Sequence, residues 1–156
     1  MKKIISLFQR NYEGDHLVRD EIVPGAEWVV LGEGVATRKY DGEAHMVRAG
    51  VLYRRYDAKQ GKTPPPGFEP AQDPDPITGH WPGWVKAEEP VSKWALKAFT
   101  PDLPNGTYEL CGPKIQGNPE HFEEHKLVHH GASLLPDAPR TFAGLREYFL
   151  LHDIEG

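Results

Sequence analysis

Hydrophobic and polar residues alternate most regularly in residues 44–56 of this 156-residue chain. Ala49-Gly50 divides that stretch, and a two-residue turn ending in glycine is typical of a tight β-hairpin. The pattern therefore predicts two antiparallel strands joined at Ala49-Gly50. Because side chains alternate between the faces of a strand, we expect Arg54 and Arg55 on opposite faces of the sheet.

Shorter apolar runs predict further strands. They lie in residues 1–26, as a pair of strands with charged turns, and in residues 27–31, 107–112 and 126–130. Trp28 falls in the second of these runs, and we expect it in the hydrophobic core.

Two stretches show helical spacing. Glu88-Glu89-Pro90 has the acidic residues and the proline that are common at helix starts, and Thr141 is a suitable N-cap. The apolar faces would be Val91, Trp94, Ala95 and Ala98 in the first helix, and Phe142, Leu145 and Phe149 in the second. Strands and helices together predict an α+β fold with antiparallel sheets.

Prolines are concentrated in residues 62–82, which contain almost no aliphatic side chains. Since proline lacks a backbone donor, we expect this segment to be an irregular loop insertion. Trp81 and Trp84 near its end have two interpretations. The favoured one is that they anchor the loop to the core, and the other is that they stack on a base.

Length and composition limit the class of protein. With 156 residues and 38% hydrophobic content, a single domain over residues 1–156 is expected. Cys111 is the only cysteine, so no disulfide can form within the chain, and we expect a cytoplasmic protein. The apolar run at residues 4–8 is too short for a signal sequence, and no membrane partner is expected.

Charge is unevenly distributed along the chain. The net charge is −5, but residues 37–62 carry an excess of +4. The basic residues there are Arg38, Lys39, Arg48, Arg54, Arg55, Lys59 and Lys62, and the acidic ones are Asp41, Glu43 and Asp57. Such an excess can focus a phosphate-bearing substrate. Scattered charge on a solvated hairpin explains it equally well.

Lys39-Tyr40-Asp41-Gly42 comes directly before the hairpin. A lysine can act as a covalent nucleophile when a rigid strand end holds its neutral amine. Asp-Gly is also a common turn dipeptide, and we interpret Gly42 as a turn former. On the strand at residues 107–112, alternation places Glu109 with the small residues Thr107 and Cys111, which leaves room for a ligand.

The order of four motifs resembles the covalent nucleotidyltransferases, which include polynucleotide ligases and capping enzymes. The motifs are Lys39-x-Asp41-Gly42, Arg55 after the hairpin turn, Tyr108-Glu109-Leu110 and Ile154-Glu155-Gly156. Three longer runs resemble the RNA ligase 1 family within that group, and these are residues 107–119 (TYELCGPKIQGNP), 129–132 (HHGA) and 79–85 (GHWPGWV). The resemblance implies an adenylation domain with antiparallel sheets around a nucleotide cleft and peripheral helices.

The resemblance also implies a function and residue roles. The chain would be an ATP-dependent RNA ligase that joins RNA 5′-phosphate and 3′-hydroxyl ends, as in RNA repair, with Mg²⁺ or Mn²⁺ and no obligate protein partner. The implied roles are Lys39 as nucleophile, Glu155 as catalytic and metal ligand, and Arg38, Arg55, Glu109 and His130 as further nucleotide contacts. Among these, Glu109 would bind the ribose hydroxyls and face the same cavity as Lys39. His130 would pack on the purine.

Several alternatives stay open at this point. The family pattern has further lysines after Glu155, so we expect the domain to be C-terminally incomplete or divergent. A related DNA ligase or capping-type enzyme, or a non-catalytic nucleotide- or RNA-binding remnant, fits the same residues. His121 and His125 are four residues apart and would form half of a zinc site if they shared a helix face.

Overall fold

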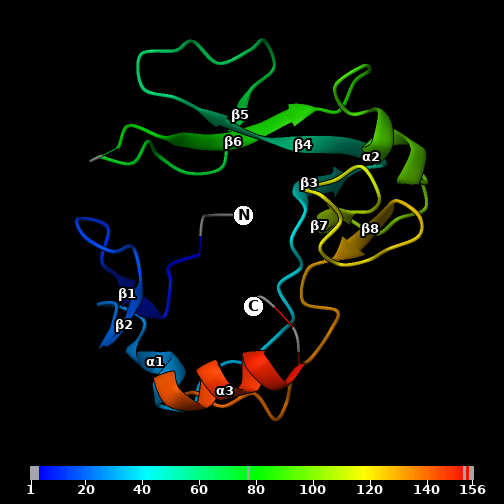
Figure 1. Cartoon of the computed structure of the whole chain (residues 1–156). Helices are drawn as coiled ribbons and strands as arrows, with labels where there is room; N and C mark the ends of the chain where they lie inside the picture. The colour runs from blue at the N-terminus through cyan, green and yellow to red at the C-terminus, as the bar shows by residue number, and fades with distance from the viewer. Residues whose placement is uncertain (1–3, 77, 153, 155–156) are drawn as a thin grey trace. The chain divides into compact units, whose positions relative to one another are not determined.

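A computed structural model describes residues 4–76, 78–152 and 154 (Figure 1). The chain forms two compact units. The first, here called the sheet unit, contains Lys39–Ala132. The second, called the terminal unit, joins Ile4–Arg38 to the segment that begins at Ser133. A single domain over residues 1–156 stays a prediction.

The sheet unit is built on one six-stranded antiparallel sheet in the order β5-β6-β4-β3-β7-β8 (Figure 1). Its strands are β3 Glu43–Arg48, β4 Val51–Ala58, β5 Glu69–Pro70, β6 Trp81–Lys86, β7 Gly106–Cys111 and β8 Lys126–His129. The predicted α+β class with antiparallel sheets is confirmed.

The hairpin of β3 and β4 has the turn that the sequence predicted. Ala49 and Gly50 have φ values of 50° and 72°, which is the pair of left-handed residues that a type I′ turn requires. Arg48 pairs with Val51 directly beside the turn, so the turn consists of Ala49 and Gly50 alone. Arg54 and Arg55 therefore lie on opposite faces of the sheet, as predicted.

One face of the sheet packs against the short helix α2 (Lys93–Ala98) to form the core. Its centre consists of Val47, Leu52, Ala87, Ala95, Tyr108, Leu110 and Ile115. The helix begins later than Glu88-Glu89-Pro90 predicted, and Val91 is 72% exposed instead of lying on the buried face. The helix has Ser92 as its N-cap instead.

The proline-rich segment is irregular through most of its described residues, 62–76 and 78–82, as predicted. Only β5 and the first residues of β6 are regular there. Trp81 donates its indole N–H to the carbonyl of Gln72 at 2.9 Å and packs edge-on against Phe68. Trp84 is 3% exposed. The burial of Trp84, which pairs with Glu69 of the loop, confirms it as an anchor to the core, whereas the contacts of Trp81 with Gln72 and Phe68 lie within the loop itself.

The terminal unit contains β1 (Phe8–Arg10) paired with β2 (Val18–Ile22), and the helices α1 (Glu27–Val30) and α3 (Phe142–His152). Residues 27–31 do not form the predicted strand. Leu31 donates its N–H to the carbonyl of Glu27, which closes a helical turn, and the Glu27 carboxylate accepts the N–H of Gly25. Trp28 is 47% exposed, so its placement in the core was wrong.

The predicted strand pair in residues 1–26 and the helix after Thr141 are confirmed. Thr141 accepts the N–H of Gly144 on its hydroxyl at 3.2 Å. Arg140, just before this helix, donates to the carbonyls of Val29 and Gly34 at 2.8 Å each, and to that of Glu33. Among the described residues, no helix is both long and apolar enough to cross a bilayer.

Candidate functional site

The face of the sheet opposite the α2 core carries two of the candidate residues in one row. Cross-strand pairing places Ala44 opposite Glu109. The register that pairs His45 with Arg54 also puts Ala44 opposite Arg55, one step along. Arg55 and Glu109 therefore point to the same side from strands on either side of β3, roughly 10 Å apart at their Cα atoms. Only the methyl group of Ala44 lies between them in this row.

Arg55 is held by its neighbours on β4 and β6. Its guanidinium lies over the indole of Trp84, 5.4 Å from the ring centroid, and its Nε donates to Asp57 at 3.2 Å. The side chain is only 19% exposed. A planar guanidinium that is stacked and partly desolvated in this way is suited to bind a phosphate or carboxylate.

Glu109 is held from the opposite side by His130. The two side chains are joined by a hydrogen bond of 2.8 Å between Nε2 and Oε2. Glu109 lies opposite Val128 on β8, and His130 follows two residues later, so both side chains are on the same face. The N–H of His130 bonds to the carbonyl of Thr107, which extends the strand pairing to this residue.

Gly42, the last residue of the Lys39 motif, lies against Glu109 of this row and its neighbour Leu110. A Cβ atom on Gly42 would lie 2.2 Å from the carbonyl oxygen of Leu110 and 3.1 Å from Cγ of Glu109. Gly42 does not adopt left-handed φ, so the interpretation of this residue as a turn former misses its main constraint. The chain bends there, but glycine is required because β7 passes so close.

The segment before Gly42 packs on the loop after β7. The backbone N–H of Asp41 donates to Glu120 at 2.8 Å, and the ring of Tyr40 lies 6.2 Å from that of Phe122. Lys39 itself is exposed and lies in an irregular segment just before β3, not at the end of a strand as expected. That Lys39 and Glu109 face one cavity stays a prediction.

Two other predicted site residues are not among the described residues of the sheet unit. Arg38 belongs to the terminal unit, where its backbone N–H donates to the carbonyl of Ser133 at 2.8 Å. Glu155 lies outside the described residues. The row on the sheet unit thus brings together Arg55, Glu109 and His130.

The basic excess of residues 37–62 does not form one patch. Arg54 and Arg55 face opposite sides of the sheet, and Arg48 forms a bidentate ion pair with Glu69, with contacts of 2.8 and 2.7 Å. A focused positive field over this stretch stays a prediction. The acidic partner of Arg48 lies outside the stretch, at Glu69.

His121 and His125 do not share a helix face, because residues 121–125 are not helical. His125 stacks on Trp94 with ring centroids 4.5 Å apart, and its Nε2 accepts the N–H of Lys114 at 3.3 Å. Burial, reinforced by Lys97 and Lys114, lowers the pKa of His125. In the part of the chain that the structure describes, no three His, Cys, Asp or Glu side chains gather as metal ligands.

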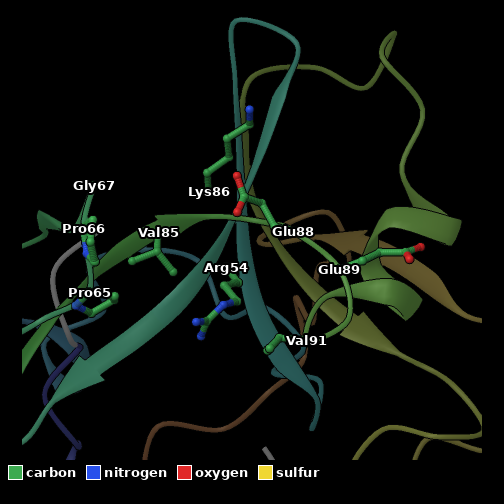
Figure 2. A pocket seen from close by; sticks show the side chains of 9 residues that line it. All are labelled: Arg54, Pro65, Pro66, Gly67, Val85, Lys86, Glu88, Glu89 and Val91. Atoms are coloured by element: carbon green, nitrogen blue, oxygen red, sulfur yellow. The ribbon is translucent and has the colours of Figure 1, made fainter.

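A pocket of about 640 Å³ lies on the core side of β4 and β6 (Figure 2). Arg54 and Lys86 line it together with the acidic Glu88 and Glu89, and its apolar wall is formed by Pro65, Pro66, Val85 and Val91. The pocket lies across the sheet from Arg55 and Glu109.

Two features of the row were not assigned from the sequence. Ala44 lies between the charged side chains in the row, and His130 forms a hydrogen bond with Glu109. That His130 packs on a purine stays a prediction. Strand alternation could have identified Ala44, because its distance in sequence from the hairpin turn determines the face of the sheet on which its side chain lies.

In comparisons with known proteins, no family model matches the chain and no curated protein matches it significantly.

Proposed function

We propose that the protein is an ATP-dependent RNA ligase that works through a lysyl-adenylate. The single observation that carries this proposal is the row in which Arg55 and Glu109 face the same side, with Gly42 of the Lys39 motif packed against Glu109. A basic group and an acceptor group separated by a small residue match a ligand with a phosphate at one end and hydroxyl donors at the other. A nucleotide is such a ligand.

Each side chain then has a defined task. The neutral amine of Lys39 attacks the α-phosphorus of ATP and a nitrogen–phosphorus bond forms. Pyrophosphate leaves with the electron pair of the broken P–O bond, and the nitrogen releases one proton to water. Arg55 binds phosphate oxygens, and Glu109 accepts hydrogen bonds from the ribose hydroxyls. The adenylyl group next passes to an RNA 5′-phosphate. The 3′-hydroxyl of the other end finally displaces AMP and forms the phosphodiester.

Mg²⁺ or Mn²⁺ is the cofactor that the resemblance implies. The described residues do not assemble three ligands for it. Mg²⁺ at nucleotide sites is commonly held by substrate phosphates, water and only one or two carboxylates. Glu155 is the proposed carboxylate, and no step of the proposal depends on a protein-only metal site.

Incubation with α-labelled ATP and Mg²⁺, followed by a denaturing gel, tests the proposal. We expect an acid-labile protein adduct that mass spectrometry maps to Lys39. Lys39→Ala and Lys39→Arg should abolish it, because guanidinium stays protonated and cannot attack. Lys59→Ala is the matched control, since Lys59 is exposed just beyond β4, and it should label like the unchanged protein. AMP on another lysine would refute the assignment.

The other candidate functions give different results in the same assay. A capping-type enzyme would label with GTP in preference to ATP, and a DNA ligase would seal nicked DNA but not RNA ends. A non-catalytic binding protein would bind ATP reversibly at equilibrium yet form no covalent adduct. Sealing of a 5′-phosphate RNA to a 3′-hydroxyl RNA, measured on a sequencing gel, completes the test.

A further inference from the structure

Arg55 and Glu109 carry opposite charges on the same face, yet no ion pair joins them. Two strand spacings are within the combined reach of an arginine and a glutamate side chain. Attraction between them would draw the carboxylate toward the guanidinium. Glu109 is instead bound by His130, on the side away from β3, and Arg55 contacts Asp57, two residues along β4.

We infer that His130 is a positioning residue that holds the Glu109 carboxylate away from Arg55, in an orientation that accepts the hydroxyl groups of a sugar phosphate. The inference rests on the proposed function, because it assigns to that site the class of ligand and the residue that maintains it. His130 touches Glu109 and not the reacting atoms.

Hydrogen-bond chemistry supports this role. An ionised carboxylate only accepts, so Nε2 of His130 must be the donor in the 2.8 Å contact with Oε2. That bond fixes one carboxylate oxygen and leaves Oε1 as an acceptor for ligand hydroxyl groups. Nδ1 of His130 is buried and has no hydrogen-bond partner among the described residues, so the ring gains its polar contact from Glu109.

Burial shows that the pair is built into the sheet. The Glu109 side chain is 13% exposed and the His130 side chain 27%. Hydrogen bonds to charged groups in such partly desolvated surroundings are stronger than those on an open surface. The adjacent His129 points to the other face, where its ring meets Tyr108 edge-on at 4.9 Å. It therefore provides a control of the same residue type on the same strand.

Equilibrium binding of AMP, which cannot react with Lys39, tests the inference. His130→Ala should weaken AMP binding about tenfold or more. Without the hydrogen bond from His130, the Glu109 carboxylate is no longer held in position as an acceptor, and the loss of a hydrogen bond to a charged group has an effect of about this size. His130→Gln should restore binding to within about threefold, since its amide N–H can occupy the place of Nε2. His129→Gln should bind AMP like the unchanged protein. Far-ultraviolet circular dichroism of each variant checks that it is folded.

Comparison of AMP with its deoxy analogues distinguishes a positioning role of His130 from a general role in stabilising the fold. The unchanged protein should prefer AMP to its 2′- and 3′-deoxy analogues, and His130→Ala should lose that preference, whereas a purely structural defect would weaken all three alike.

Retention of the full preference by His130→Ala would overturn the inference. If the unchanged protein binds none of the three nucleotides, the proposed function fails and the inference fails with it. The two failures are therefore distinguishable by the behaviour of the unchanged protein.

Discussion

Gly42→Ala is the perturbation whose effect the structure defines best. The new methyl group would lie 2.2 Å from the carbonyl oxygen and 3.0 Å from the carbonyl carbon of Leu110. Ordinary contacts are ~3.5 Å, so the two backbones must separate by roughly 1 Å. The obstacle is the backbone of β7 itself, which cannot rotate away as a side chain would.

The cost has two parts. Overpacking costs about 1–3 kcal/mol, and the weakening of a β3–β7 backbone hydrogen bond adds about 1 kcal/mol. We therefore expect Gly42→Ala to lower the free energy of unfolding by about 2–4 kcal/mol. The same displacement moves Glu109, whose Cγ lies 3.1 Å from the new methyl position, so AMP binding should weaken as well.

Urea unfolding, followed by far-ultraviolet circular dichroism, measures the loss. With a slope of about 2 kcal/mol per molar urea, the midpoint should fall by about 1–2 M. Gly61→Ala is the matched control, because Gly61 has a φ of +72° and nothing within 4 Å of its Cβ position. It should lose only about 1 kcal/mol, from backbone strain. A midpoint for Gly42→Ala as high as that of Gly61→Ala would refute the close-approach argument.

Two further predictions concern stability. Arg140→Ala should lower the free energy of unfolding of the terminal unit by about 2–4 kcal/mol, because three backbone carbonyls lose a charged donor. Arg146→Ala, on the exposed side of α3, should have little effect, and urea unfolding of both variants checks the difference. Burial lowers the pKa of His45, which is 2% exposed, so the unfolded chain binds a proton that the folded chain does not. Stability should therefore be full above pH ~6.5 and fall below it by up to about 1.4 kcal/mol per pH unit. His45→Asn, which can still donate to the carbonyl of Glu43, should flatten that slope between pH 7.5 and 5.5, and an unchanged slope would show that other groups cause it.

The elements that the sequence predicted correctly are those determined by neighbours along the chain. The β3–β4 hairpin depends on Ala49-Gly50 and on strict alternation, and both are local. Strand alternation also gave the correct faces for Arg54, Arg55 and Glu109, because one strand position fixes all the others. Once residues 107–112 were predicted to form a strand, the face of Glu109 followed.

The errors arose where the deciding contact is distant in sequence. Residues 27–31 have strand-forming side chains but no strand beside them, and a single helical turn satisfies their backbone instead. The constraint on Gly42 comes from Leu110, on a strand far along the chain. Neither contact leaves a periodic signal in the sequence, so pattern alone could not have supplied them.

The distribution of charge determines how a ligand would be recognised at the row. Arg48 forms an ion pair with Glu69, and Arg54 faces the opposite side of the sheet from Glu109, whereas Arg55 faces the same side as Glu109. If the row binds a nucleotide as proposed, one guanidinium and one carboxylate on either side of Ala44 would distinguish ligands by the spacing of their donor and acceptor groups. We therefore expect ionic strength to change AMP binding less than the sugar modifications do.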